Sequence, residues 1–147
     1  MLIEVVNRQR LVRIDSRRIE VVGRAVLAAV LKTGPWSATV AFGRDRLITQ
    51  LNRRHRGVNA ATDVLSFQAG GATGPNSSFV WETDYLGDVL ISAETANRQA
   101  AEAGHTVDRE IEELVIHGLL HLCGYDHETD RGEMNRLEVK LRRKLLD

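Results

Sequence analysis

The sequence predicts one domain that combines several helices with a few short strands. Its 147 residues suffice for a single hydrophobic core, and no internal repeat or linker divides them. Short segments rich in apolar and β-branched residues alternate with longer segments whose apolar residues recur at helical spacing. Hydrophobic residues make up 43% of the chain and charged residues 27%, which is the balance of an ordinary globular protein.

The order of these segments gives the expected elements. The predicted strands cover residues 2–6, 36–42, 62–67 and 86–91. The predicted helices cover residues 16–32, 44–54, 93–103, a segment from 107 and a segment from 131. Residues 10–14 are either a further strand or an extended lead-in to the first helix, and Trp36 is expected in the core.

Capping residues support the helix boundaries. Side chains that can accept a hydrogen bond from a free helix N–H stand at the predicted starts, and glycine or proline follows the predicted ends. The starts are at Asp15 or Ser16, at Ser92 and at Thr106, and the stops are at Gly34 with Pro35 and at Gly104.

Two other segments are less regular. Residues 69–83 are rich in glycine and serine and predict a flexible loop that could border a cleft. Within it, Phe79, Val80 and Trp81 either extend a strand or anchor the loop. The cationic run at residues 53–56 follows the second helix, and within it Arg53 and Arg54 are expected to be a solvated helix end that offsets the negative end of the helix dipole.

The last two helices differ in their patterns. The helix from residue 107 is apolar on most sides, so we expect it to be covered nearly all round and to be rigid. The last helix has one apolar stripe, and its many arginine and glutamate residues are expected to form a solvated face. That stripe consists of Met134, Leu137, Leu141 and Leu145.

Charge and cysteine content narrow the function classes. The net charge is zero, which argues against a protein that coats nucleic acid through bulk electrostatics. The N-terminus lacks the long apolar stretch of a signal peptide, and no segment approaches the length of a membrane span. The single cysteine, Cys123, excludes an internal disulfide and is expected to be a core residue. We therefore expect a cytoplasmic protein without a membrane partner.

Three of the five histidines have a spacing that suits one metal ion. His117 and His121 stand four residues apart, which places them one turn apart on the same face of a helix. Gly124 can end this helix in a left-handed conformation, so that His127 turns back to the same point. Three imidazoles without a fourth protein ligand predict a catalytic zinc site, because structural zinc is normally closed by four ligands. His105 is expected at the surface.

Position 118 bears on the reaction class. Zinc peptidases with the related spacing carry a glutamate directly after the first histidine, where it accepts a proton during hydrolysis. Here that residue is Gly118. Glu113 lies one turn before His117 and is the remaining candidate for the proton transfer. The missing carboxylate weakens the peptidase interpretation.

The run HGLLHLCGYDH, from His117 to His127, resembles the signature of the YbeY-type bacterial endoribonucleases. TDVLSF at 62–67 and LGDVLIS at 86–92 resemble the other two recurrent segments of that family, in the same order. The resemblance covers residues 1–147 as one domain. It implies a compact α+β fold, with a small mixed four-stranded sheet packed by about five helices and a zincin-like metal site on a central helix.

The resemblance also implies an activity. One Zn²⁺ ion would be bound by His117, His121 and His127, and the enzyme would cut single-stranded RNA. Its work would be the maturation of ribosomal RNA ends, notably the 3′ end of 16S rRNA, and ribosome quality control. Its partners would then be ribosomal RNA, the small ribosomal subunit and other ribosome-associated proteins.

The family's catalytic arginine lies in a segment similar to LNxxYR, which the segment LNRRHR at 51–56 matches. The resemblance therefore assigns catalysis to Arg56 together with His117. His55 replaces the usual aromatic residue of that segment, and Gln68 stands where proline often follows the serine and phenylalanine of the strand.

These parts suit the cleavage of a phosphodiester. Its transition state gains negative charge, which zinc as a Lewis acid and the planar guanidinium of Arg56 can stabilise. The sequence leaves open whether water or the 2′-hydroxyl of the RNA is the nucleophile. It also leaves two alternative functions open. One is a zinc metallopeptidase, and the other is a ribosome-associated factor without catalytic activity in which zinc only braces the fold.

Overall fold

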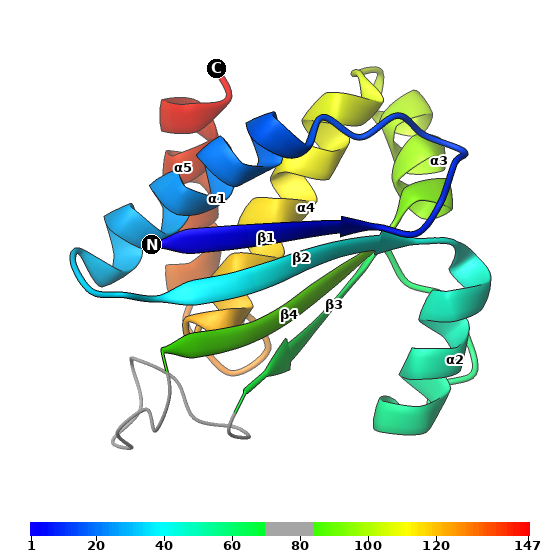
Figure 1. Ribbon diagram of the computed structural model, residues 1–147, viewed down its shortest axis with the longest axis horizontal. Coiled ribbons are helices and arrows are strands. Elements are labelled where there is room, and N and C mark those ends of the chain that lie inside the picture. Colours follow the sequence, from blue (N-terminus) through cyan, green and yellow to red (C-terminus); the bar gives the residue numbers. More distant parts are fainter. Residues whose placement is uncertain (70–83) are drawn as a thin grey trace.

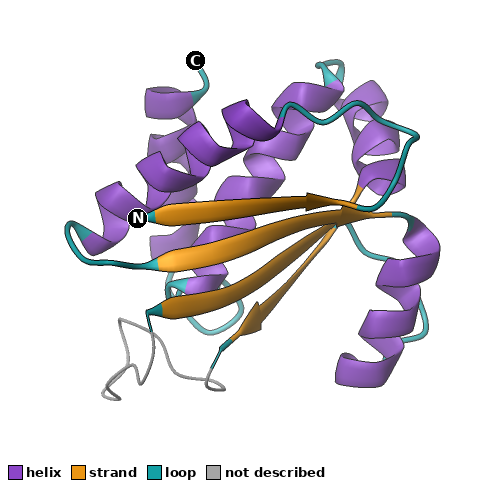
Figure 2. Cartoon of the chain, viewed as in Figure 1, coloured by secondary structure: helices purple, strands orange, loops and turns teal. Residues whose placement is uncertain are grey.

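The predicted strands form one sheet in the computed structural model, which describes residues 1–69 and 84–147 (Figures 1 and 2). The strands are β1 (Leu2–Asn7), β2 (Ser37–Gly43), β3 (Val64–Gln68) and β4 (Tyr85–Ser92). Their order across the sheet is β1-β2-β4-β3. Strands β1, β2 and β4 are parallel, whereas β3 is antiparallel to β4 and lies at one edge. The expected small mixed sheet is confirmed.

Five helices in the described part of the chain pack around this sheet, as expected for an α+β fold. They are α1 (Ser16–Leu31), α2 (Asp45–Arg56), α3 (Ala93–Ala103), α4 (Val107–Leu122) and α5 (Glu133–Leu145). Figure 1 shows α1, α4 and α5 gathered on one side of the sheet, whereas α2 projects on the other side near one end of the strands.

Helix α4 is the centre of the core. It contacts α1, α3, α5, β3 and β4. Its buried residues surround the helix instead of forming one stripe, as the sequence predicts, and they are Ile111, Leu114, Val115, Ile116, Gly118, Leu119, Leu120 and Leu122. A helix enclosed on most sides holds any side chain that it carries in a fixed position.

The two faces of the sheet are covered unequally. The main core lies between the sheet and helices α1 and α4, and from the sheet it contains Val40, Phe42, Val89 and Ile91. Among the described residues, the opposite face has only a small buried cluster, formed by Ile48 of α2 with Leu65 and Leu90. The partial cover on this side leaves room for a cavity beside β3.

The predicted helix caps are present. The side chains of Asp15, Ser92 and Thr106 accept hydrogen bonds from backbone N–H groups three residues later, over 3.1, 3.2 and 3.1 Å. Gly104 ends α3 with a left-handed backbone, φ 74°. Each cap satisfies a helix-end group that otherwise lacks a partner in the helix.

Two expectations from the sequence need correction. Helix α2 runs on through His55 and Arg56 to Gly57, so the cationic run is its last turn and does not follow it. Arginine is a good helix former, and positive charge at this end complements the dipole. Trp36 is half-buried at the border of the core, before β2 begins, and its Nε1–H donates to the Thr33 carbonyl over 3.3 Å.

Residues 10–14 form a bend and an extended lead-in, and not a further strand. The Gln9 side chain holds this bend, since its Oε1 accepts from the Val12 N–H over 2.9 Å and its Nε2 donates to the Val12 carbonyl over 2.8 Å. The predicted loop at 69–83, with Phe79, Val80 and Trp81, lies outside the described residues except for residue 69. In the described part, no helix is long and apolar enough to cross a bilayer.

Candidate metal centre

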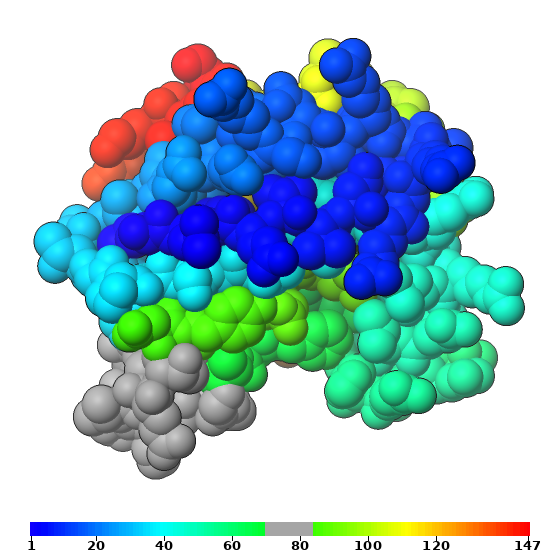
Figure 3. All heavy atoms as spheres, in the orientation of Figure 1, coloured from blue at the N-terminus to red at the C-terminus, as the bar shows by residue number. Residues whose placement is uncertain are grey.

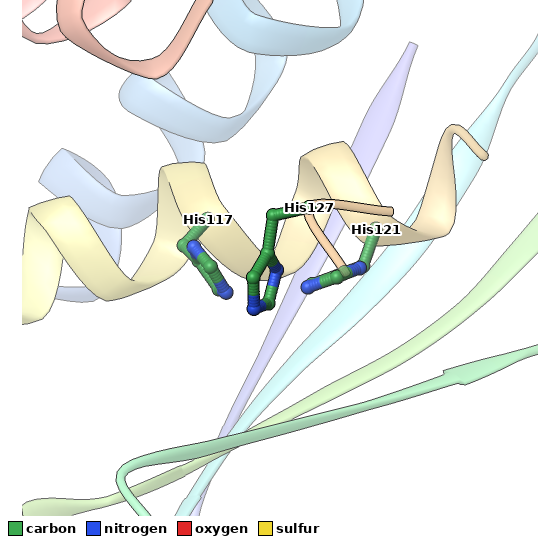
Figure 4. A group of neighbouring side chains, drawn as sticks. All are labelled: His117, His121 and His127. Carbon is green, nitrogen blue, oxygen red and sulfur yellow. The ribbon is translucent and has the colours of Figure 1, made fainter. Parts of the chain in front are cut away.

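The end of α4 and the turn after it bring three histidines together (Figure 4). His117 and His121 project from one face of the helix, and His127 reaches the same point from the following turn. The ring centroids are 4.8 Å apart for 117 and 121, 5.4 Å for 117 and 127, and 5.2 Å for 121 and 127. One nitrogen from each ring lies within 4.8 Å of the others. These residues could therefore hold a metal ion.

Backbone hydrogen bonds form the turn that brings His127 back towards His117 and His121. The N–H of Gly124 donates to the His121 carbonyl over 3.0 Å, and the N–H of Tyr125 donates to the Leu120 carbonyl over 3.1 Å. This pair of bonds is the Schellman arrangement, which requires a left-handed residue at Gly124, where φ is 98°. The spacing of the three histidines is thus fixed by local backbone geometry.

The donor set fits zinc. Among the described residues, the group contains three histidines and no cysteine or carboxylate. Burial lowers the pKa of His121, and the charge of His117 lowers it further, so the neutral imidazole that a metal requires is favoured. Three imidazoles leave a coordination position open, as in catalytic zinc sites.

A buried carboxylate from α5 orients the first histidine. Nδ1 of His117 is hydrogen-bonded to Oε1 of Glu138, which is only 6% exposed. An ionised carboxylate accepts the Nδ1–H, so the lone pair of His117 is left on Nε2, the nitrogen free to bind a metal. The expectation that the acids of the last helix form a solvated face is therefore wrong for Glu138. It follows Met134 by four residues and precedes Leu141 by three, so its place on the apolar stripe was visible in the sequence.

Ion pairs extend from this carboxylate through the interface of α4 and α5. Nη2 of Arg142 lies 2.9 Å from Oε2 of Glu138, and its Nη1 lies 3.1 Å from Oε1 of Glu113. Glu113 also pairs with Nε of Arg109 over 3.0 Å. Its carboxylate is thus held by two arginines, and Glu113 does not line the cavity beside the histidines.

Gly118 lets α4 approach the sheet closely. A Cβ atom at this position would lie 2.4 Å from Cγ1 of Val89 and 3.3 Å from Oγ of Ser66. No side chain, and hence no catalytic carboxylate, fits here without displacement of the sheet or the helix. The absence of a side chain at Gly118 therefore allows the sheet to pack directly against α4.

Strand β3 is bonded directly to the helix of the ligands. Oγ of Ser66 donates to the Gly118 carbonyl over 3.1 Å, and Nε2 of Gln68 donates to the His121 carbonyl over 3.0 Å. Gln68 is the residue that departs from the usual proline of the family, and sequence reasoning gave it no role. The Gln68 amide links the edge of the sheet to the backbone of His121.

Two other residues are placed away from the ligand group. Cys123 is fully buried, and burial raises the pKa of its thiol to about 12, so it is a protonated core residue as expected. His105 is not a free surface residue, because its Nε2 lies 2.7 Å from Oε1 of Glu110 and its side chain is 29% exposed.

A cavity of about 1400 Å³ joins the histidines to the end of α2. Its walls include His117, His121 and His127 on one side, and His55 and Arg56 on the other. The space-filling view shows α2 projecting past the green strands, with a recess between them (Figure 3). The structure thus brings the predicted Arg56 to the same cavity as the three histidines.

Comparisons with known proteins agree with this architecture. The family model described as Endoribonuclease YbeY matches residues 4–146. A protein of Roseiflexus sp. (strain RS-1) named Endoribonuclease YbeY is 41% identical over 138 residues, which cover 90% of this chain and 84% of that protein. A protein of the same name from Chloroflexus aurantiacus (strain J-10-fl) is 42% identical over 129 residues, covering 86% and 82%.

A solved structure has the same fold. The solution structure of TM1509 from Thermotoga maritima superposes with a TM-score of 0.64 at 26% sequence identity, and the match covers 98% of this chain and 89% of that one. A match over nearly the whole chain, in both sequence and structure, includes the helix of the three histidines and its turn. The chain therefore belongs to the endoribonuclease YbeY family.

Proposed function

We propose that this protein is a zinc-dependent endoribonuclease that cuts single-stranded RNA. One observation carries the proposal: the three histidines and the guanidinium of Arg56 line the same cavity. His117, His121 and His127 would hold one Zn²⁺ ion. When bound, zinc supplies Lewis-acid stabilisation of negative charge on a phosphate. Membership of the endoribonuclease family supports RNA as the substrate.

Arg56 is free to bind the phosphate that is cut. In the described part of the chain no carboxylate forms an ion pair with its side chain, which is exposed at the end of α2. A guanidinium can donate two parallel hydrogen bonds to a phosphate, and these strengthen as charge builds up in the transition state. Arg56 and the ligand His117 are accordingly the residues on which we expect catalysis to depend.

The placement of the cavity supports selectivity for single strands. It extends from the ligands along β3 to α2, so a nucleotide inside it contacts protein on several sides. An unpaired strand can bend its backbone into such a space, whereas the stacked bases of a duplex keep the backbone outside.

The biological substrate that we propose is ribosomal RNA, with cleavage that matures its ends, notably the 3′ end of 16S rRNA. Action on the small ribosomal subunit in the cytoplasm and a role in ribosome quality control go with this substrate. The net charge of zero gives little non-specific attraction to RNA. Delivery to the ribosome therefore relies on protein partners there.

The structure weakens the peptidase alternative. Gly118 is packed against Val89, and Glu113 is held by Arg109 and Arg142, so neither position offers a free carboxylate beside the ligands. A factor in which zinc only braces the fold would not need a cavity beside the metal. Here a cavity connects the three histidines to Arg56, which argues against that alternative.

The test is cleavage of ribosomal RNA fragments, single-stranded and double-stranded, with the metal content of each protein measured. The unaltered protein should cut only the single strand, and a chelator should stop it until zinc is restored. Arg56→Ala should lose cleavage by a factor on the order of 10²–10³ and keep its zinc. Arg54→Ala is the matched control, because Arg54 is on the same helix turn but does not line the cavity.

Three results would count against the proposal. Cleavage that survives the chelator and His117→Ala would indicate a contaminating nuclease. Digestion of casein with no cutting of RNA would favour a peptidase. Zinc that raises thermal stability, in a protein that binds RNA and never cuts it, would favour the structural factor.

A further inference from the structure

An aromatic pair borders the cavity outside the group of ligands. His55 is in the last turn of α2 and Phe67 is on β3, with ring centroids 5.0 Å apart and ring planes at 55°. His55 is exposed and Phe67 is half-buried, so the protein encloses neither ring. Both side chains line the cavity that contains the three ligands.

Beside this pair the cavity has an apolar floor. Ala41, Leu51, Leu65 and Leu90 line it; Leu65 and Leu90 belong to the small cluster between α2 and the sheet, and Ala41 and Leu51 pack against that cluster. A metal ion and a guanidinium suffice for chemistry on a phosphate, but they leave this aliphatic and aromatic surface without a use. Its complement is a ligand with a flat apolar part.

Positive charge adjoins the aromatic surface. Arg56 directly follows His55 and lines the same cavity, and Arg53 and Arg54 precede them in the same helix turn. A nucleotide has the matching arrangement, because its aromatic base and its anionic phosphate are joined through one sugar. The same cavity is also lined by four acidic residues, which are Asp63, Asp88, Asp126 and Glu128. It is therefore the guanidinium beside the rings, and not a net positive charge of the cavity, that favours a nucleotide over an apolar peptide as the occupant.

We propose that His55 and Phe67 form a stacking site for one unpaired base of the RNA. The base lies against these rings, while the adjoining phosphate faces Arg56. Every base has an aromatic face, so such a site accepts different sequences, whereas a base that remains paired in a duplex cannot enter it. This inference rests on the proposed function and assigns a ligand to the part of the cavity that the metal does not use.

The test is a double-mutant cycle between the ring of His55 and the bases of the RNA. Fluorescence anisotropy measures binding of a short single-stranded 2′-O-methyl RNA, and of a series in which one position at a time lacks its base. A gel confirms that each oligonucleotide stays intact. For the unaltered protein, loss of one particular base should weaken binding about tenfold, the usual scale of base stacking on an aromatic side chain.

The same base should cease to matter in His55→Ala, whereas His55→Phe should restore the difference because it keeps a ring. Arg54→Ala should weaken binding slightly and equally across the series. A contact that only packs α2 onto β3 would instead lower the thermal stability of His55→Ala and weaken all oligonucleotides alike. That result overturns the stacking site.

Two further outcomes separate this inference from the proposed function. One such outcome is normal cleavage of single-stranded RNA, while removal of each base changes binding equally in the unaltered protein and in His55→Ala. That outcome overturns the stacking site and leaves the proposed endoribonuclease activity standing. Absence of any RNA binding or cleavage overturns both. Binding of unfolded casein that depends on His55, without dependence on any base, would assign the cavity to a peptide and also overturn the stacking site.

Discussion

The C-terminal ends of α4 and α2 border one cavity but are held in opposite ways. The end of α4 is buried, closed by a Schellman turn, bonded to β3 through Gln68 and oriented by Glu138. The end of α2 carries His55 and Arg56 in solvent, and no ion pair within the described residues restrains Arg56. Metal binding needs ligands fixed within tenths of an ångström, whereas a contact to a flexible RNA strand tolerates adjustment.

The start of α2 makes the contrast sharper. Oδ1 of Asp45 accepts hydrogen bonds from Ser92 over 2.5 Å and from Thr95 over 2.7 Å, and its Oδ2 lies 2.9 Å from Arg98. Helix α2 is thus anchored by charged hydrogen bonds at its first turn, whereas at its last turn His55 only touches the ring of Phe67 and Arg56 has no ion pair among the described residues. Changes at the fixed end of α4 should alter metal binding or stability, and changes at the last turn of α2 should alter RNA binding or catalysis without loss of metal or stability.

The largest effect is expected from His121→Ala, which removes a ligand from the rigid end. Bound zinc should fall well below one ion per chain, and cleavage of single-stranded RNA should fall to background, because two imidazoles hold zinc weakly. Elemental analysis and a cleavage assay measure the two losses. The control is His105→Ala, a histidine outside the ligand group, which should keep both. Full zinc in His121→Ala would contradict the assignment.

Gly118→Ala tests the close packing under the ligands. The added methyl group would lie 2.4 Å from Cγ1 of Val89, so the free energy of unfolding should fall by about 1–3 kcal/mol. Urea unfolding measures the loss. Adding Val89→Ala makes room for the methyl group, so the double variant should lose less than the sum of the single changes. Strict additivity would show that the helix does not depend on this contact.

Glu138→Gln tests the orientation of His117. An amide keeps the shape of the side chain but not its charge, so zinc affinity should fall about 10–100-fold while the protein stays folded. Competition with a chromophoric chelator measures the affinity. The matched change on the exposed first turn of the same helix is Glu133→Gln, for which no change in affinity is expected. Equal zinc affinities in Glu138→Gln and Glu133→Gln would show that Glu138 does not support metal binding.

Arg56→Lys tests the last turn of α2. Lysine keeps the charge but loses the planar pair of donors, so kcat should fall by about tenfold, with zinc content and melting temperature unchanged. Single-turnover cleavage and thermal unfolding measure these quantities. A lower melting temperature would show that Arg56 is part of the packing, and the contrast between the two helix ends would fail.

The smallest effect concerns the anchor of α2 and its dependence on pH. Burial alone raises the pKa of Asp45, but hydrogen bonds from Ser92, Thr95 and Arg98 outweigh it and lower the pKa below the ordinary value of 3.8. A carboxyl whose pKa is lowered in the folded state adds stability above its ordinary pKa, and that stability is lost as the pH falls through the folded value.

Asp45→Asn should therefore destabilise the protein by about 1 kcal/mol at neutral pH. Its deficit relative to the unaltered protein should shrink as the pH falls from roughly 5 to 2. Urea unfolding at several pH values measures this difference. A deficit that stays constant over this range would show that the charge of Asp45 does not matter.

The same contrast explains what the sequence could predict. The three histidines lie in one helix and its turn, so their meeting depends on local geometry that the spacing of His117, His121, Gly124 and His127 encodes directly. The helix caps at Ser92 and Thr106 are equally local. Arg56 could be assigned only through resemblance, because its place at the cavity depends on how α2 packs against the sheet.

Contacts between distant segments were missed for the same reason. Ser66 and Gln68 reach the carbonyls of α4 from a strand more than fifty residues away, and no local pattern marks such a bond. The strand order β1-β2-β4-β3 is likewise a property of the assembled sheet. Glu138 is the exception, since the sequence shows its position on the apolar stripe of α5, and only its charge suggests exposure.

The turn at Gly124 also bears on how much folded protein a cell contains. Because it brings His127 back to His117, an ion held there is a cross-link between a helix and the segment after it. Ligand that binds only the folded chain stabilises it by mass action, by about 2.7 kcal/mol when the free ion is a hundredfold above its dissociation constant. With the zinc site proposed above, cells starved of zinc would then lose the protein to proteolysis as well as its proposed activity, so its abundance would report on their metal supply.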